Sequence, residues 1–259
     1  MVSARLIAHR REGGRGFTLI ELLVVVVIIG LLIAIILPSL LRAKEQGVRA
    51  SCAARLRMWA QAEHLYGAEN NTALIPGTRD MGDGPGTRSE HVIFLEISSV
   101  NQFLDYGKNK KMLGCPRAEK TLPTLFTAQP SKPNADYLLG YSYLAGHGYK
   151  YSWGDQGYSP INWPTTNGWF SPLSTNDPPG SVVASDMNDW EKSGWTLAPH
   201  AFYKYLTFAS TGGQTPKQVG SAGGNVAYLD GSVQWVPIDK MKSYTTYSNT
   251  GSTDYRTNW

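Results

Sequence analysis

The feature that most constrains this chain is a long apolar run near its start, over residues 17–37 (FTLIELLVVVVIIGLLIAIIL). From Leu22 to Leu37 no side chain is polar, whereas a core helix of a soluble protein keeps a polar face. As a helix the run is about 31 Å long, close to the thickness of one hydrocarbon layer. The sequence therefore predicts a membrane-spanning helix over residues 17–38.

A short basic leader precedes this run. Residues 1–16 carry most of the chain's formal net charge of +4, through Arg5, Arg10, Arg11 and Arg15 against Glu12. Basic flanks favour the cytoplasmic side of a membrane, so we expect the leader in the cytoplasm and everything after about Leu40 across the membrane. The nearly neutral remainder disfavours a basic nucleic-acid-binding body.

Two simpler interpretations of the run are a cleaved secretory signal peptide and a plain uncleaved anchor. The run is longer than a usual signal core of about 7–15 residues, and no A-x-A-like site follows it. In addition, Glu21 lies just inside it, where a carboxylate costs roughly 2–3 kcal/mol and so needs a partner or a function. A cut between Gly16 and Phe17 would create an α-amine able to pair with Glu21, in the same chain or in a neighbour.

The stretch Arg15-Gly16-Phe17-Thr18-Leu19-Ile20-Glu21, followed by LLVVVVIIGLLIAIILP, resembles the class III signal of type IV pilins and type II secretion pseudopilins, including the major pseudopilin of the general secretion pathway (protein G). The resemblance implies a prepilin peptidase that cuts after Gly16 and N-methylates Phe17. It also implies that Glu21 docks against the Phe17 amine of a neighbouring subunit. Pro38 matches the family's helix proline, and because it cannot donate to the carbonyl of Ala34, we expect a kink or loosening there.

Residues 39–67 predict an amphipathic continuation of the helix beyond the membrane. An apolar stripe recurs at helical spacing through Val48, Cys52, Leu56, Trp59 and Tyr66. Four charged residues are expected largely off this stripe: Arg49, Arg55, Arg57 and Glu63. Gly67 and Asn70-Asn71 predict the end of the helix.

Residues 68–259 predict a loop-rich head with short antiparallel strands, which makes the fold class α+β and pilin-like. Residues 91–97 fit a strand or a helix, and residues 181–187 begin as a strand. The segment GGNVAYLDGSVQWVP predicts a hairpin with a two-residue type I′ turn at Asp230-Gly231, in which Tyr228 faces Val233 and Val226 faces Trp235. We expect these four side chains to be buried on one face.

The rest of the head carries weaker signals. Residues 140–180 are rich in Gly, Pro, Tyr and Trp, which favours aromatic packing over carbohydrate binding. The head resembles secretion pseudopilins that end in a histidine–spacer–Asp-Gly hairpin, but Gly220 stands where that histidine would fall. Lys108, Lys110 and Lys111 form a short basic run typical of a solvated loop.

Two cysteines exclude a disulfide-dense scaffold and a four-cysteine zinc site. If the head is outside the cytoplasm, a bond between Cys52 and Cys115 is our hypothesis, with two free buried thiols as the alternative.

Calcium is a weak candidate ligand, since hard cations need clustered oxygens and Asp186, Asn188 and Asp189 form one local cluster, with Asp80 and Asp83 in another. Neither has the EF-hand spacing, and a polar turn is a sufficient explanation of each. The five histidines (His9, His64, His91, His147 and His200) stand in unrelated contexts, and no catalytic motif is present. We therefore expect no enzyme and no required cofactor.

The sequence favours a structural subunit that polymerises through its N-terminal helix into a type II secretion pseudopilus or a related filament. Its expected partners are a prepilin peptidase, other pilin-like subunits and an inner-membrane assembly platform, with no nucleic acid. Its expected location is the inner membrane, single-pass, with the head periplasmic. The alternative is a membrane-anchored protein whose ligand-binding or enzymatic head does not polymerise.

Overall fold

The fold was analysed in a computed structural model, which describes residues 17–77, 79–80, 88–89, 92–121, 136–147, 171–191, 194–201, 206–207, 212–248 and 254–259. The leader, with Gly16, lies outside the described residues, and so do His9, Asp83, His91 and most of the aromatic-rich segment. The chain divides into two compact units, residues 1–46 and 47–259.

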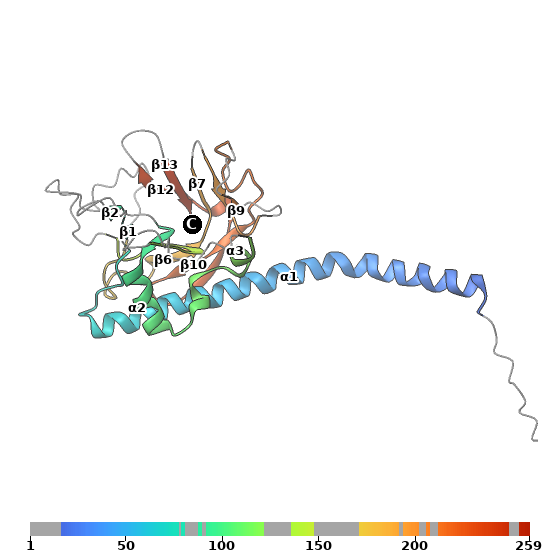
Figure 1. The fold of residues 1–259 in the computed structure, drawn as a ribbon, viewed down its shortest axis with the longest axis horizontal. Coiled ribbons are helices and arrows are strands. Elements are labelled where there is room, and N and C mark those ends of the chain that lie inside the picture. The colour runs from blue at the N-terminus through green and yellow to red at the C-terminus, as the bar shows by residue number, and fades with distance from the viewer. Residues whose placement is uncertain are drawn as a thin grey trace, which may run out of the picture. The chain divides into compact units, whose positions relative to one another are not determined.

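One long helix and a set of short strands make up the described structure (Figure 1). The helices are α1 (Leu19–Glu69), α2 (Ile97–Gly107) and α3 (Pro116–Thr121), with 3-10 turns η1 (Lys110–Leu113) and η3 (Ile238–Lys240). The strands are β1 (Arg79–Asp80), β2 (Arg88–Ser89), β3 (Phe94–Glu96), β4 (Asp136–Leu138), β5 (Tyr141–Tyr143), β6 (Val182–Asp186), β7 (Asp189–Glu191), β8 (Thr196–Leu197), β9 (Leu206–Thr207), β10 (Gly223–Tyr228), β11 (Val233–Pro237), β12 (Ser243–Ser248) and β13 (Asp254–Asn258). The predicted α+β class is confirmed.

All the strand pairs of the described residues are antiparallel. The larger sheets have the strand orders β11-β10-β6-β5 and β12-β13-β7-β8-β9, and two further pairs are β1-β2 and β3-β4. Residues 187–188 connect β6 in the first sheet directly to β7 in the second. Residues 91–97, which fitted either element, contain β3 and then the start of α2.

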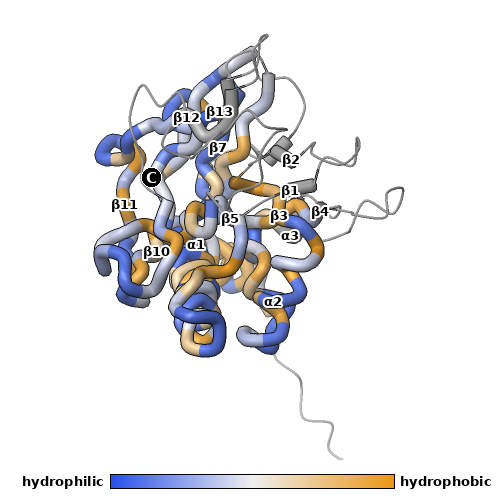
Figure 2. Tube along the Cα trace, turned by 90° about the vertical axis from the view of Figure 1, so that its left-hand side faces the viewer, coloured by the Kyte–Doolittle hydropathy of each residue, from blue (hydrophilic) through white to orange (hydrophobic). Residues whose placement is uncertain are grey.

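The second half of α1 packs against the head, as its apolar stripe predicts. Cys52, Leu56 and Trp59 are fully buried, while Val48 and Tyr66 pack on the edge of the same core. Trp59 is fully buried in this core, and the centroids of its ring and the Phe103 ring are 4.2 Å apart. The Trp59 indole N–H donates to the carbonyl of Met112. Helix α1 and strands β5, β6 and β10 all contribute residues to this core, and Figure 2 colours the chain by hydropathy.

The prediction for Glu63 was wrong, because this residue is fully buried. Its carboxyl group lies 2.8 Å from the amide nitrogen of Ile75 and 2.6 Å from the Tyr143 hydroxyl. The helical stripe is therefore wider than the apolar residues alone indicate, since head groups satisfy a polar side chain within it. Arg57 is exposed as predicted.

The β10-β11 hairpin forms, but its predicted register was wrong. The pairs are Ala227 with Val233 and Asn225 with Trp235, one residue away from the predicted pairing. The loop has three residues rather than two, since the Tyr228 amide donates to the Ser232 carbonyl and Gly231 has a φ of +82°. Such a loop adds one residue in the left-handed conformation, which shifts the partner strand by one.

Candidate functional site

The segment around Glu21 begins α1 with a capping box. The Glu21 carboxylate accepts hydrogen bonds from the Thr18 amide at 2.9 Å and from the Thr18 hydroxyl at 2.8 Å, and the Glu21 amide donates back to that hydroxyl at 3.3 Å. Thr18 and Glu21 thus satisfy helix-end donors reciprocally, and the negative charge lies at the positive end of the helix dipole. The Glu21 carboxylate thus has a hydrogen-bond partner in its own chain, Thr18, which directly follows Phe17.

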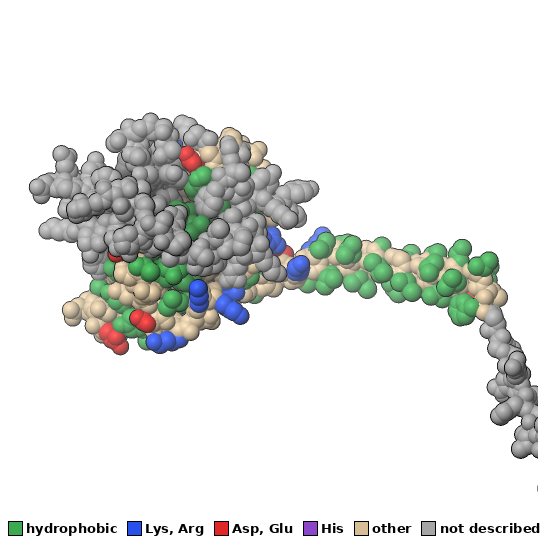
Figure 3. All heavy atoms as spheres, viewed as in Figure 1, with side chains coloured by type: hydrophobic (Ala, Val, Ile, Leu, Met, Phe, Trp, Pro, Cys, Tyr) green, Lys and Arg blue, Asp and Glu red, His purple; other side chains and the backbone are tan. Residues whose placement is uncertain are grey.

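The first part of α1 presents apolar side chains in every direction. Large hydrophobic residues from Leu19 to Leu41 are between 45% and 88% exposed, and Figure 3 shows hydrophobic side chains along the visible face of this part of the helix. By its length and composition α1 is able to cross a membrane. An apolar surface of this extent needs lipid or other apolar helices around it.

Pro38 lies within α1, which is continuous from Leu19 to Glu69. The Ser39 hydroxyl donates to the carbonyl of Ile36 at 2.7 Å, one turn earlier. A kink at Pro38 stays a prediction. The helix ends close to the predicted place, where Asn71 and Thr72 take positive φ values of 53° and 64°.

Cys52 and Cys115 come together in the core of the head. Their sulfur atoms are 2.9 Å apart and both residues are fully buried, as free thiols in this structure. Cys52 lies on α1, and Cys115 follows η1 in a Gly-Cys-Pro turn. The predicted proximity of Cys52 and Cys115 is therefore present in the fold, while a covalent bond between them stays a prediction.

Two further side chains complete this group. They are Asp186 at the end of β6 and His200 beside the isolated bridge between Ala201 and Ser221. Each of the four side chains offers one ligand atom, and these four atoms lie within 4.8 Å of one another. The His200 Nε2 atom is 3.1 Å from the Asp186 Oδ2 atom. We call these four residues the Cys-Asp-His cluster.

The surroundings of the cluster shift the acidity of both thiols in opposite directions. Burial opposes ionisation of Cys115, but hydrogen bonds from Cys52 and from His200 outweigh it and lower the pKa of Cys115 to about 6. The hydrogen bond with Cys115 and burial raise the pKa of Cys52. The same surroundings thus favour the thiolate form of Cys115 and the thiol form of Cys52.

The three calcium candidates, Asp186, Asn188 and Asp189, contact different groups in the fold. Asp186 belongs to the Cys-Asp-His cluster, whereas the Asn188 side-chain oxygen accepts from the Ser221 hydroxyl at 2.7 Å. Asp189 accepts hydrogen bonds from the hydroxyls of Ser142 and Thr257. Burial raises the pKa of Asp189 to about 7, although those two hydroxyls lower it. Calcium binding by these residues, a weak candidate from the sequence, stays an untested hypothesis.

The position of the absent family histidine is a surface turn. Gly220 has a φ of +80°, and a Cβ atom there would meet nothing within 4 Å. Asp230 holds the hairpin loop by accepting a hydrogen bond from the Ser232 amide at 2.8 Å. Turn formation therefore remains a sufficient explanation of Asp230 and Gly231.

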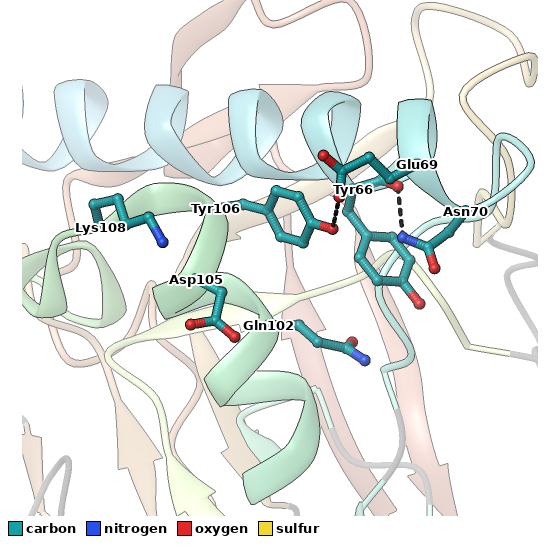
Figure 4. Close-up of a pocket in the computed structure, with 7 residues that line it drawn as sticks. All are labelled: Tyr66, Glu69, Asn70, Gln102, Asp105, Tyr106 and Lys108. Atoms are coloured by element: carbon teal, nitrogen blue, oxygen red, sulfur yellow. Dashed lines mark hydrogen bonds between the residues drawn. The ribbon is translucent and has the colours of Figure 1, made fainter.

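A shallow depression of about 630 Å³ lies between the end of α1 and α2 (Figure 4). Within it the Tyr106 hydroxyl donates to the Glu69 carboxylate at 2.6 Å, and the Tyr66 and Tyr106 rings meet edge to face. These contacts join the two helices, and packing explains them. The nearby Lys108, Lys110 and Lys111 are exposed, as predicted for a solvated basic run.

Sequence reasoning missed two features of these sites. The Thr18-x-x-Glu21 capping box was readable, because its spacing is a recognised helix-start signal. His200 gave no such signal, since it is 148 residues from Cys52 in the sequence and has no motif around it. Only the fold brings it to the cysteines.

Comparison with protein families identifies a prokaryotic N-terminal methylation motif at residues 14–37. This match includes Gly16, Phe17, Glu21 and the first part of α1. Comparison with curated proteins yields no match, and neither does comparison with solved structures. The N-terminal segment is thus a type IV pilin-like signal, joined to an apolar helix suited to membrane anchoring.

Proposed function

We propose that this chain is a pilin-like structural subunit that is cut after Gly16, N-methylated at Phe17 and polymerised through α1. The observation that carries the proposal is the methylation motif, which makes Glu21 the fifth residue of the mature chain at the start of an exposed apolar helix. Helix-to-helix packing supplies most of the cohesion of such a filament, and a Glu21–amine pair sets the register.

The proposed filament is a pseudopilus of a type II secretion system. The head resembles that of secretion pseudopilins, which favours this system over an adhesive pilus. The resemblance lies in residues 74–77 (LIPG), the Gly-Cys-Pro turn at residues 114–116 and the Asp230-Gly231 hairpin. In this proposal a prepilin peptidase processes the chain in the inner membrane, with the leader cytoplasmic and the head periplasmic. An assembly platform in the same membrane then adds subunits, and the protein itself catalyses no reaction.

The capping box suggests how the charge of Glu21 can be separated from its structural role. Glu21→Gln keeps a side-chain acceptor for Thr18 and removes the negative charge, because glutamine also fits a capping box. Thr18→Ala removes the cap, at a cost of about 1 kcal/mol in helix stability, and leaves the charge. The two variants therefore test opposite halves of the same site.

The experiment places each variant in cells that lack the wild-type copy and measures sheared filaments against membrane-bound subunit. We expect Glu21→Gln to be processed and stable in the membrane but to lose most of its filaments, while Thr18→Ala assembles. The mass of the mature chain verifies processing in both variants. Normal assembly of Glu21→Gln would contradict the ion-pair mechanism. A wild-type chain that is stable in the membrane but forms no filaments would favour a non-polymerising anchor.

A further inference from the structure

The Cys-Asp-His cluster brings four metal-ligand side chains together from distant parts of the head. Cys52 is on α1, Cys115 lies between η1 and α3, Asp186 ends β6, and His200 precedes the bridge to Ser221. None of the four is more than 2% exposed. Buried ionisable groups are costly unless they are paired or bind a metal, so such a convergence needs a physical reason.

The donor set matches one class of metal. Two thiolates, one imidazole and one carboxylate are the ligands that Zn²⁺ uses, and their number equals that of a closed tetrahedral site. Calcium and magnesium prefer oxygen ligands, and sulfur donors disfavour them. Sulfur atoms bound to one zinc at about 2.3 Å lie roughly 3.8 Å apart, so binding requires the two sulfurs, now at 2.9 Å, to separate by rotation of their side chains.

Asp186 supplies an independent observation. Its Oδ2 atom accepts hydrogen bonds from the amide of Asn225 at 2.7 Å and from the Asn225 side chain at 2.8 Å. Its Oδ1 atom is buried and has no hydrogen-bond partner among the described residues. A carboxylate held by a neighbour through one oxygen, with the other available, is the usual arrangement of a supported metal ligand.

The surroundings close the cluster on several sides. The Trp235 ring meets the His200 ring edge to face at 5.3 Å, and the Arg49 guanidinium lies 3.9 Å from the centre of the same tryptophan ring. The fully buried Tyr141 side chain lies beside Cys52. Four protein donors complete a tetrahedral coordination shell and leave no coordination position for a substrate, which is typical of structural zinc sites.

A disulfide is the competing explanation, and it involves only half of the cluster. It would use the two sulfurs and leave the Asp186 carboxylate and His200 buried beside an uncharged bond. A divalent cation instead neutralises the thiolates and binds the carboxylate and the imidazole as well. We propose that Cys52, Cys115, Asp186 and His200 form a structural Zn²⁺ site that joins the second half of α1 to the sheet of the head.

The test uses the full-length chain, extracted from membranes in mild detergent without chelator. Elemental analysis is expected to find stoichiometric zinc, and both thiols are expected to be alkylated once the protein is denatured without a reductant. EDTA should lower the melting temperature and added Zn²⁺ should restore it, because a ligand of the native state stabilises that state. Cobalt in place of zinc should give sulfur-to-metal charge-transfer absorption in the near ultraviolet.

Cys115→Ser and His200→Gln should reduce bound zinc to background, and Cys115→Ser should weaken the cobalt–sulfur band. His64→Gln is the matched control, since His64 is an exposed head histidine outside the cluster, and it should retain zinc. If a variant fails to fold, the wild-type zinc and thiol measurements still decide. A Cys52–Cys115 disulfide in the isolated chain, or two free thiols without zinc in the wild type, would overturn the proposal.

Discussion

At the scale of single residues, Glu63 is a buried acid whose pKa is shifted by burial and by two hydrogen bonds. The Tyr143 hydroxyl has one hydrogen, yet it lies 2.6 Å from Glu63 and also 2.6 Å from the carbonyl of Ile75. The hydroxyl donates toward both oxygens, so its one hydrogen is shared between the Glu63 carboxyl group and the Ile75 carbonyl. Burial raises the pKa of Glu63 to about 8, and the hydrogen bonds from Tyr143 and Ile75 oppose this rise.

This raised pKa predicts that the free energy of unfolding of the head falls as the pH rises from about 4.5 to about 8. Because the folded pKa of Glu63 exceeds the unfolded one of about 4.5, its contribution to stability is complete below pH 4.5 and is lost as the pH rises toward 8. We expect Glu63→Gln to flatten this loss, which for the wild type is on the order of a few kcal/mol. Unfolding of the full-length chain at several pH values measures the difference.

Glu69→Gln is the control for this experiment, since it removes one carboxyl group from an exposed position on the same helix and keeps an acceptor for the Tyr106 hydroxyl. Asp189 adds a loss of the same sign, because burial raises its pKa as well. The slope should therefore decrease in Glu63→Gln without vanishing. An unchanged slope in that variant would mean that Glu63 is ionised in the folded head.

At the scale of elements, the β10-β11 hairpin depends on two glycines for different reasons. Gly231 has a φ of +82°, but a Cβ atom there would meet nothing within 4 Å. Gly223 has a φ of +129°, and its Cβ atom would lie 2.1 Å from the carbonyl oxygen of Val236. The first position needs only a backbone conformation, whereas the second also needs space.

We therefore expect Gly231→Ala to lower the free energy of unfolding by about 1 kcal/mol and Gly223→Ala to lower it by clearly more. Gly231→Asn should remain close to the wild type, because asparagine tolerates the left-handed conformation. Denaturant unfolding of the three variants measures these differences. Equal losses for Gly231→Ala and Gly223→Ala would show that the close approach to Val236 is relieved without cost.

Helix α1 has two surroundings along one continuous element. From Leu19 to Leu41 its apolar side chains are exposed, while from Cys52 onward one face is buried against the head. The two compact units divide between Gln46 and Gly47, within this helix. Residues 47–69 therefore belong structurally with the head, whereas the apolar residues before them need an apolar environment such as lipid.

At the scale of the whole molecule, the methylation motif predicts a mature chain that differs from the printed sequence. We expect protein isolated from its own cells to lack residues 1–16 and to carry one added methyl group on Phe17. Intact-mass spectrometry of the membrane fraction measures both changes. Gly16→Leu should retain the leader, because the motif has glycine immediately before the cut, and a wild-type chain that still begins at Met1 would contradict the processing model.

The sequence by itself determined those features that depend on local order along the chain. The apolar first part of α1 follows from the length and composition of its run. The apolar stripe from Val48 to Tyr66 and the two hairpin strands follow from periodicity, which acts over a few residues. The methylation motif is likewise contiguous, so its residues were identified without a fold. Register failed at the hairpin because one extra loop residue shifts a strand, and the pattern of Asp-Gly does not reveal that residue.

Only the tertiary structure decided which distant polar groups meet in the core. Glu63 is buried because Ile75 and Tyr143 satisfy it, and neither lies within one helical turn of it in the sequence. Likewise, His200 and Asp186 reach the two cysteines through the pairing of strands and the connections between them. Periodicity reports whether a side chain faces inward, but the partner that makes a buried charge stable comes from another part of the chain, and packing alone selects it.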